Sequence, residues 1–392
     1  MDSNMRILII SPLMPYPLND GASHRIYNIL KLLAHAHEIT LAVLTMAPKR
    51  MEYITALNGI CKALHVVEIK RSPTTRLLDI LGSPFREKPY LANIYNQCEM
   101  TRIVERYGSQ VDVAQAEFAY ICPYITGLTC KTILDEHNVE WDLQKRIAEA
   151  HTHPIAKFSF LLQYRKMKRL EHECVLRVDK VLTTSINDRQ LLEPLNPNVS
   201  VIPNCVDRIY KPVSVSDNNR TVTYIGLMNY LPNVDAMLFF SKSIWPILKK
   251  IEKDVNFYII GKNPPARIRG LNGYGISVTG SVPDVKVYLR RTAVFIAPIR
   301  MGGGTRIKIL EAMSHGIPVV STSMGCMGLD VTDGDNILIA DDPKVFAEKI
   351  LYLLGNKDER IRIGLSGREL VRSRYTWAGI SDEIERVYRN GN

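Results

Sequence analysis

The segment from Arg300 to Met313 contains the residues best suited to bind an anionic ligand. Three consecutive glycines (302–304) let a backbone approach a ligand closely and leave its amides exposed. The helix expected after this turn directs its positive end to the same place. Arg306 and Lys308 add formal positive charge, and Glu311 can accept hydrogen bonds from sugar hydroxyls. The segment predicts a site for a diphosphate with a ribose attached. The alternative is a glycine-rich turn followed by a solvated basic helix start.

A histidine follows another predicted strand. The run Thr132–Asp135 is apolar and ends in a carboxylate, and His137 comes two residues later. In a parallel sheet this position lies at the carboxyl edge, where such sheets bind ligands. The alternative is a structural loop histidine.

The first predicted strand, Arg6–Ser11, is followed by a turn-rich loop that ends in Gly21 and Ala22. A glycine there lets a backbone amide approach a phosphate or an acceptor. Arg25 is either a phosphate contact or a surface residue, and the sequence leaves both open.

Metal-binding patterns are missing from the sequence. No cluster of His, Cys and Asp has the spacing of a metal site. Asp333-Gly334-Asp335 spells DxD, but an Asp-Gly pair before a short strand is typical of a turn. We predict a site without metal and without a cofactor. The seven cysteines are scattered and contain no CxxC pair, which favours a reducing cytoplasm.

The stretch Lys157–Arg169 has five basic residues, no acidic ones, and aromatic and leucine side chains between them. A basic amphipathic helix of this kind can lie on an anionic membrane. The alternative is a helix that buries Phe158, Leu161 and Leu162 in a core and solvates its lysines. We expect a cytoplasmic protein, and the basic helix leaves open a peripheral position on the inner face of the plasma membrane.

Strands and helices alternate along the whole chain, which predicts an α/β fold with parallel sheets. Residues 211–220 are polar and lack periodicity, so we expect a linker there between two doubly wound domains. The predicted parts are an N-terminal domain (1–210), the linker (211–220), a C-terminal domain (221–375) and a final helix (376–392) that packs back towards the N-terminal domain. Two such domains in tandem place a cleft between the carboxyl edges of their sheets.

Length and composition agree with this organisation. The chain has 392 residues, of which 46% are hydrophobic and 23% charged, as in soluble globular enzymes. The net charge of +10 permits an anionic partner. Its basic residues form no recognisable nucleic-acid motif, so we expect no nucleic acid. The apolar runs near the start are too short for a membrane span or a signal peptide.

The pattern from Gly302 to Thr322, Gly-Gly-Gly-Thr-Arg-x-Lys-x-Leu-Glu-Ala-Met-x-x-Gly-x-Pro-Val-Val-Ser-Thr, resembles the donor-binding signature of family 4 glycosyltransferases. Three further stretches, at 135–140, 202–207 and 224–235, resemble other segments of this family in the same order. The likeness is greatest to bacterial sugar transferases associated with exopolysaccharide gene clusters. The resemblance implies the GT-B fold, in which two Rossmann-like domains face each other across a cleft.

The resemblance also implies roles for particular residues. Transfer from a nucleotide-diphosphate sugar is expected, with His137 and Glu311 as catalytic residues and Gly21, Ala22 and Arg25 in the acceptor or phosphate loop. The residues we assign to the donor are Gly226, Asn229, Arg300, Gly303, Gly304, Thr305, Arg306, Lys308 and Glu311.

This sequence departs from the family pattern at three positions. Many members have a glutamate where Gly303 stands, and an Arg and a Lys where Leu227 and Pro232 stand. We infer that Arg306 and Lys308, together with Arg300, supply the missing positive charge.

The predicted function is a sugar transfer to a glycan or polyprenyl-linked acceptor, with retention and without metal, in polysaccharide or glycoconjugate biosynthesis. Two alternatives stay open: a nucleotide-sugar epimerase on the same fold, and a non-catalytic module that binds anionic membranes. The sequence leaves open the donor sugar and base, the acceptor, the linkage and the oligomeric state.

Overall fold

The computed structural model describes residues 4–18, 20–46, 51–150, 153–213 and 216–389. Its contacts divide the chain into two compact units, which are described separately. The first unit runs to Pro203 and includes the last helix, α16 (Ser381–Arg389). The second unit is Asn204–Ile380. Each unit contains one sheet of parallel strands, which confirms the two parallel-sheet α/β domains expected from the sequence.

The first unit holds a seven-stranded sheet in the order β3-β2-β1-β4-β5-β6-β7. Its strands are β1 (Arg6–Ser11), β2 (Glu38–Thr45), β3 (Ala63–Glu68), β4 (Val113–Glu117), β5 (Lys131–Glu136), β6 (Lys180–Thr183) and β7 (Val199–Val201). The central strands are buried on both faces, so they consist of nearly continuous apolar residues. In the register of β1, Ile9 pairs with Leu41 of β2 and with Gln115 of β4.

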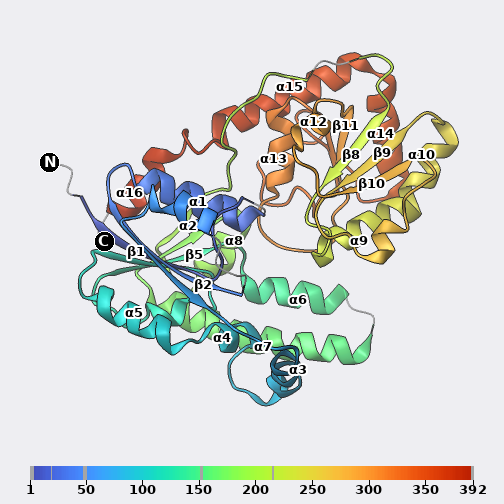
Figure 1. The fold of residues 1–392 in the computed structure, drawn as a ribbon. Helices are drawn as coiled ribbons and strands as arrows, with labels where there is room; N and C mark the ends of the chain where they lie inside the picture. The colour runs from blue at the N-terminus through green and yellow to red at the C-terminus, as the bar shows by residue number, and fades with distance from the viewer. Residues whose placement is uncertain (1–3, 19, 47–50, 151–152, 214–215, 390–392) are drawn as a thin grey trace. The chain divides into compact units, whose positions relative to one another are not determined.

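Helices cover both faces of this sheet, with α1 and α2 on one side and α5 and α7 on the other (Figure 1). The main helices are α1 (Gly21–Leu33), α2 (Met51–Asn58), α3 (Pro73–Gly82), α4 (Tyr90–Tyr95), α5 (Cys98–Gly108), α6 (Glu140–Ala150), α7 (Pro154–Arg177) and α8 (Ile186–Leu192), with short 3-10 turns η1 (Ser83–Phe85) and η2 (Cys122–Tyr124). Helix α1 begins with a capping box, in which Asp20 and Ser23 each accept a backbone N–H from the other.

The second unit holds a six-stranded sheet in the order β10-β9-β8-β11-β12-β13. Its strands are β8 (Thr221–Ile225), β9 (Asn256–Ile260), β10 (Ile276–Gly280), β11 (Val294–Ala297), β12 (Val319–Ser321) and β13 (Leu338–Ile339). Its helices are α9 (Leu231–Phe239), α10 (Trp245–Ile251), α11 (Ala266–Arg269), α12 (Lys286–Leu289), α13 (Ile307–Ser314), α14 (Pro343–Gly355) and α15 (Lys357–Arg374). Aromatic side chains fill the core beside this sheet, among them Phe240, Trp245, Phe257 and Phe346.

One helix expected from the sequence is divided. A single helix over 234–251 is predicted, but a π-turn, η3 (Phe240–Ile244), separates α9 from α10. Pro246 lies in the first turn of α10 and has no backbone N–H to continue the ladder of α9.

Residues 204–210, expected at the end of the N-terminal domain, belong to the second unit. The contacts divide the chain after Pro203, whereas the sequence places the linker at 211–220. Val206 donates its backbone N–H to Tyr375, and its carbonyl accepts from Trp377. Tyr210 stacks on His315 with 4.0 Å between the ring centroids. These contacts attach residues 204–210 to the second unit, and the functional division of the domains stays a prediction.

Gly261, directly after β9, is predicted to contribute to the stability of the second unit, because a larger residue does not fit there. A Cβ at this position would lie 1.7 Å from the carbonyl oxygen of Gly226. We expect Gly261→Ala to lower the free energy of unfolding by about 1–3 kcal/mol, because the backbone must move. Chemical denaturation measures this loss. Gly59→Ala is the control, since its Cβ has no described atom within 4 Å, and an equal loss in both variants would contradict the prediction.

Candidate functional site

The glycine-rich turn joins β11 to α13 at the carboxyl edge of the second sheet. Gly302 and Gly304 have φ angles of 114° and 68°, in the left-handed region that favours glycine. Helix α13 (Ile307–Ser314) begins directly after this turn, and Arg306 is its N-cap residue. The glycines therefore have a conformational role that does not depend on any ligand.

Lys308 lies at the centre of the polar groups on this edge. Its Nζ donates to the hydroxyl of Tyr224 over 2.7 Å and to Oδ1 of Asn233 over 2.8 Å. Gly226 is the residue after β8, and it lies close to Lys308. A Cβ at this position would be 2.7 Å from the same Nζ. The structure thus brings together two predicted donor residues, Lys308 and Gly226, with two that sequence reasoning missed, Tyr224 and Asn233.

Burial and the neighbouring Arg306 lower the pKa of Lys308 to about 7, and Glu311 opposes this shift. The ammonium is therefore partly deprotonated near neutral pH. An anion placed beside it favours the charged form and raises its pKa. Lys308 can thus respond to a diphosphate by taking up a proton.

Arg306 and Thr305 belong to the glycine-rich turn, and Arg306 bonds to its backbone. Nη1 of Arg306 donates to the carbonyl of Gly304 over 2.9 Å and also to that of Gly303. The hydroxyl of Thr305 is buried, and among the described residues it has no hydrogen-bond partner. A buried polar group without a partner is costly and points to a missing ligand or water.

The remaining predicted donor residues occupy different settings. Arg300 forms a 2.7 Å ion pair with Asp235 and lies over the ring of Phe239, so its charge is already paired. Asn229 is exposed in the loop after β8, and Glu311 is half-buried on α13. Whether these residues bind a donor stays a prediction.

In the first unit, His137 follows β5 at the carboxyl edge of the sheet. Its Nε2 lies 2.7 Å from a carboxylate oxygen of Glu117, which also accepts from Gln115. The ring of Phe118 stacks on the imidazole with 4.1 Å between the centroids. Phe118 has a φ angle of 74°, which is rare for an aromatic residue and often marks a functional site. Within the described ranges no group bonds to Nδ1 of His137.

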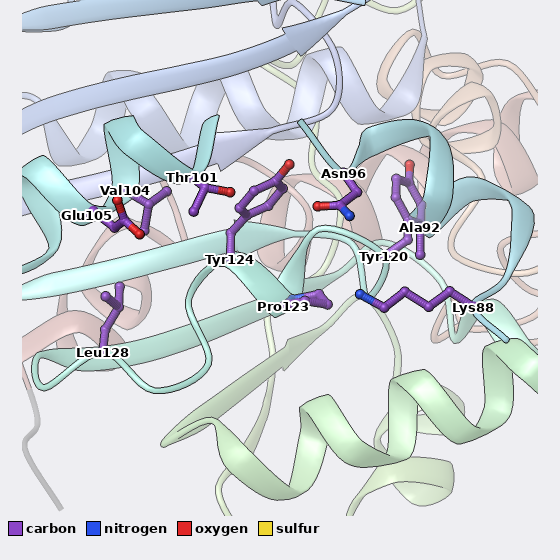
Figure 2. A pocket seen from close by; sticks show the side chains of 10 residues that line it. All are labelled: Lys88, Ala92, Asn96, Thr101, Val104, Glu105, Tyr120, Pro123, Tyr124 and Leu128. Carbon is purple, nitrogen blue, oxygen red and sulfur yellow. The ribbon is translucent and has the colours of Figure 1, made fainter. Parts of the chain in front are cut away.

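A pocket of about 320 Å³ lies in the same unit, lined among others by residues of α4, α5 and η2. Tyr120 lines it and stacks on Phe118, with 5.3 Å between the ring centroids. Asn96, Thr101 and Glu105 add polar groups, as Figure 2 shows. An aromatic face among amide, hydroxyl and carboxylate groups is suited to a sugar-sized ligand. Sequence reasoning missed this pocket, because its lining comes from separate segments of the chain.

Arg25 is neither the phosphate contact nor the surface residue that the sequence left open. Both it and Asp135 are fully buried, and its Nε and Nη2 bond to the Asp135 carboxylate over 2.7–3.1 Å. Its Nη1 donates to the carbonyl of Ile202 over 2.6 Å. Gly21, in contrast, is exposed at the start of α1, and Ala22 is half-buried there.

Glu117, Asp135 and His137 each offer one ligand atom, and these atoms lie within 4.8 Å of one another. The Asp135 carboxylate is already bonded to Arg25, and Glu117 is bonded to His137 and Gln115. This arrangement satisfies the three side chains without an ion. The absence of metal from the reaction stays a prediction.

A second group of buried acids lies next to His137 and was missed by sequence reasoning. Glu171 accepts the backbone N–H groups of Glu140 and Trp141 over 3.0 and 2.9 Å. Both carboxylate oxygens of Glu136 are buried, without a partner anywhere in the part of the chain that is described. Burial and the other two glutamates raise the pKa of Glu136 well above its usual value, and burial raises that of Glu140 to about 7. This group therefore holds protons near neutral pH.

Comparison with known proteins agrees with the motifs. Residues 219–356 match the family model of glycosyl transferases group 1. An uncharacterized 44.6 kDa protein in the cps region of Klebsiella pneumoniae is 22% identical over 94% of this chain and 96% of its own length. A phosphatidyl-myo-inositol mannosyltransferase of Mycobacterium leprae is 26% identical over 62% of this chain and 66% of its own length.

The fold has close counterparts among solved structures. Anabaena Alr3699/HepE, in complex with UDP and glucose, has a TM-score of 0.69 and 15% identity, covering 98% of this chain and 99% of its own. Such neighbours confirm the predicted GT-B fold. Together these matches confirm the resemblance to glycosyltransferases and do not favour the epimerase or the non-catalytic module.

Proposed function

This chain is a glycosyltransferase of the GT-B fold, and we propose that it transfers a sugar from a nucleotide-diphosphate donor to a glycan or polyprenyl-linked acceptor. The observation that carries the proposal is the group around Lys308 at the carboxyl edge of the second sheet. Similar proteins support it, since Anabaena Alr3699/HepE was solved in complex with UDP and glucose and the relative from Mycobacterium leprae is a mannosyltransferase.

In this proposal the second unit holds the donor. The Gly302–Gly304 turn and the amino end of α13 receive the diphosphate, and Lys308 supplies positive charge. Charge develops on the leaving diphosphate as the glycosidic bond breaks. Fixed amides and a nearby cation stabilise that charge without reorganising. Glu311 holds the ribose hydroxyls, and the transfer needs no metal.

The acceptor is assigned to the first unit. His137 contacts the transferred sugar, and the pocket beside Tyr120 receives a sugar of the acceptor. We propose retention through front-face transfer, in which the departing phosphate oxygen takes the acceptor proton. The comparison with a relative from a cps region supports a role in polysaccharide biosynthesis.

The donor assignment predicts a nucleotide that stabilises the protein through Glu311. A ligand that binds only the folded state raises the melting temperature by mass action. We expect one of the nucleotides UDP, GDP, ADP and dTDP to raise the melting temperature of the wild type, both with and without EDTA. Glu311→Ala should weaken that binding about tenfold, as expected for the loss of hydrogen bonds to a charged group. Thermal-shift titrations measure both effects.

Glu348→Ala is the matched control, since Glu348 is exposed on α14 of the same unit. Equal shifts in both variants would overturn the role of Glu311. If no nucleotide stabilises the wild type, the donor site itself is wrong. If the shift needs metal, the site is supported but the metal-free reaction is not.

The pKa of Lys308 predicts that nucleotide-diphosphate binding depends on pH. Lys308 is charged below pH 7 and loses its proton above it, because its pKa is lowered to about 7. Binding of the nucleotide diphosphate that stabilises the wild type should therefore weaken about tenfold between pH 7 and pH 8.5, since the diphosphate requires the charged ammonium. Isothermal titration calorimetry at several pH values measures this change. In Lys308→Met the affinity at pH 7 should be lower and this pH dependence lost, and a variant that keeps it would contradict the assignment.

A further inference from the structure

Helix α3 and the turn η1 expose an unusual number of large apolar side chains. Leu77, Leu78, Ile80, Leu81 and Phe85 are each between 56% and 91% exposed, and we call them the α3 patch. No side chain of α3, all of which is described, is buried. Contiguous exposed apolar side chains on a soluble domain mark an interaction surface.

The α3 patch is held in place by polar contacts to α7. The Ser83 hydroxyl of η1 accepts from Gln163 over 2.6 Å. The ammonium of Lys166 donates to the carbonyls of Ser83 and Pro84 over 2.7 and 2.9 Å. The sequence assigned the stretch Lys157–Arg169 to a membrane or to a core. Lys166 instead supports the turn that carries the patch.

The alternative that α7 buries Phe158 in a core is wrong, because this side chain is 63% exposed. Ile155, one turn earlier, is 76% exposed. Leu161 and Leu162 are half-buried. The first turns of α7 therefore add apolar surface to the same unit. None of the described helices is long and apolar enough to cross a bilayer.

The charges around the patch are predominantly positive. Residues 70–88 contain five basic and two acidic side chains. Both acids are paired: Asp79 with Arg71 and Arg86, and Glu87 with Arg169. The exposed cations Lys70, Arg76 and Lys88 form no ion pair with any described residue. A surface with apolar side chains among unpaired cations is complementary to an anionic bilayer.

We propose that the α3 patch inserts into the headgroup region of an anionic membrane and docks the first unit on it. The apolar side chains enter the boundary of the acyl chains, and the cations contact lipid phosphates. This binding goes beyond the transfer reaction, since it needs neither donor nor acceptor. A bilayer, rather than a second copy of the chain, is favoured because two copies would bring these unpaired cations together.

Flotation of the full-length protein with vesicles tests the proposal. We expect binding to vesicles of equal parts phosphatidylglycerol and phosphatidylcholine and little binding to phosphatidylcholine alone. Leu77→Asp combined with Leu81→Asp should weaken binding at least about tenfold. Arg76→Gln should weaken binding to the anionic vesicles about fivefold. Added salt should also weaken this binding.

Leu365→Asp is the control, because Leu365 is 45% exposed on α15 of the second unit and lies outside the patch. Equal loss in this control, or unchanged binding in the double variant, would overturn the proposal. Light scattering gives the oligomeric state, and a dimer that the double variant converts to monomer without any vesicle binding would also overturn it. UDP thermal shifts in the double variant should equal those of the wild type, which separates this test from that of the donor site.

Discussion

Arg25→Met is expected to lower the free energy of unfolding of the first unit by about 3–5 kcal/mol. Arg25 and Asp135 are both fully buried, and the guanidinium bonds to both oxygens of the carboxylate. Removing the cation leaves a buried carboxylate without compensation, and it also leaves the carbonyl of Ile202 without its donor. Urea denaturation followed by circular dichroism measures the loss.

Two further variants separate charge from packing. Arg25→Met combined with Asp135→Leu should recover part of the loss, since replacing both members of a buried pair by apolar residues removes the uncompensated charge. Arg6→Ala breaks an exposed ion pair with Asp112 and should cost about 0–1 kcal/mol. If Arg25→Met lowers the free energy of unfolding no more than Arg6→Ala does, the prediction is wrong and water reaches the Arg25–Asp135 pair.

The strands that sequence reasoning located correctly are those covered on both faces. From the sequence, residues 221–225, 256–260 and 294–297 are each predicted as a strand, because each is a short, largely apolar run between turns. These ranges equal β8, β9 and β11. Strand β3 (Ala63–Glu68) was not predicted. It lies at the edge of the sheet and most of its side chains are only partly buried, so its sequence lacks the apolar run.

The candidate site was predictable where the chemistry is local in sequence. The glycine turn and Lys308 lie within seven residues of one another, so their types and spacing indicated an anion site. The partners of Lys308 were not predictable, because Tyr224 and Asn233 come from β8 and α9. The same holds for Arg25 and Asp135, which are 110 residues apart. Such an ion pair is structural because both of its members are buried. Burial depends on the tertiary fold, so the spacing of residues in the sequence does not predict it.

His137→Ala is expected to lower turnover about 10²-fold to 10³-fold, the usual loss when one donor to the reacting centre is removed. The structure orients the imidazole through Glu117 and Phe118 and leaves Nδ1 without a bond from any described residue. Release of nucleotide from the donor identified by thermal shift measures turnover. Affinity for the nucleotide alone should be unchanged, because the residues assigned to the nucleotide diphosphate lie in the second unit.

His65→Ala is the control for a histidine in the same unit. His65 lies in β3 at the edge of the sheet, and its imidazole bonds to the hydroxyl of Tyr107 in α5. This control should keep its turnover within about twofold. Turnover in His137→Ala equal to that of this control would make His137 a structural residue and end its assignment to the reaction.

Glu117→Gln tests whether the orientation of His137, rather than its presence alone, determines the rate. The Glu117 carboxylate is fixed by Gln115, whose other amide atom bonds to the hydroxyl of Tyr388 on α16. Glutamine keeps the shape but removes the charge, so we expect a smaller loss of turnover, about tenfold, in kcat rather than in KM. Tyr388→Phe, further along this chain of bonds, should have a still smaller effect. Equal losses in His137→Ala, Glu117→Gln and Tyr388→Phe would instead indicate that the network supports folding, since a positioning effect must decline with distance from the histidine.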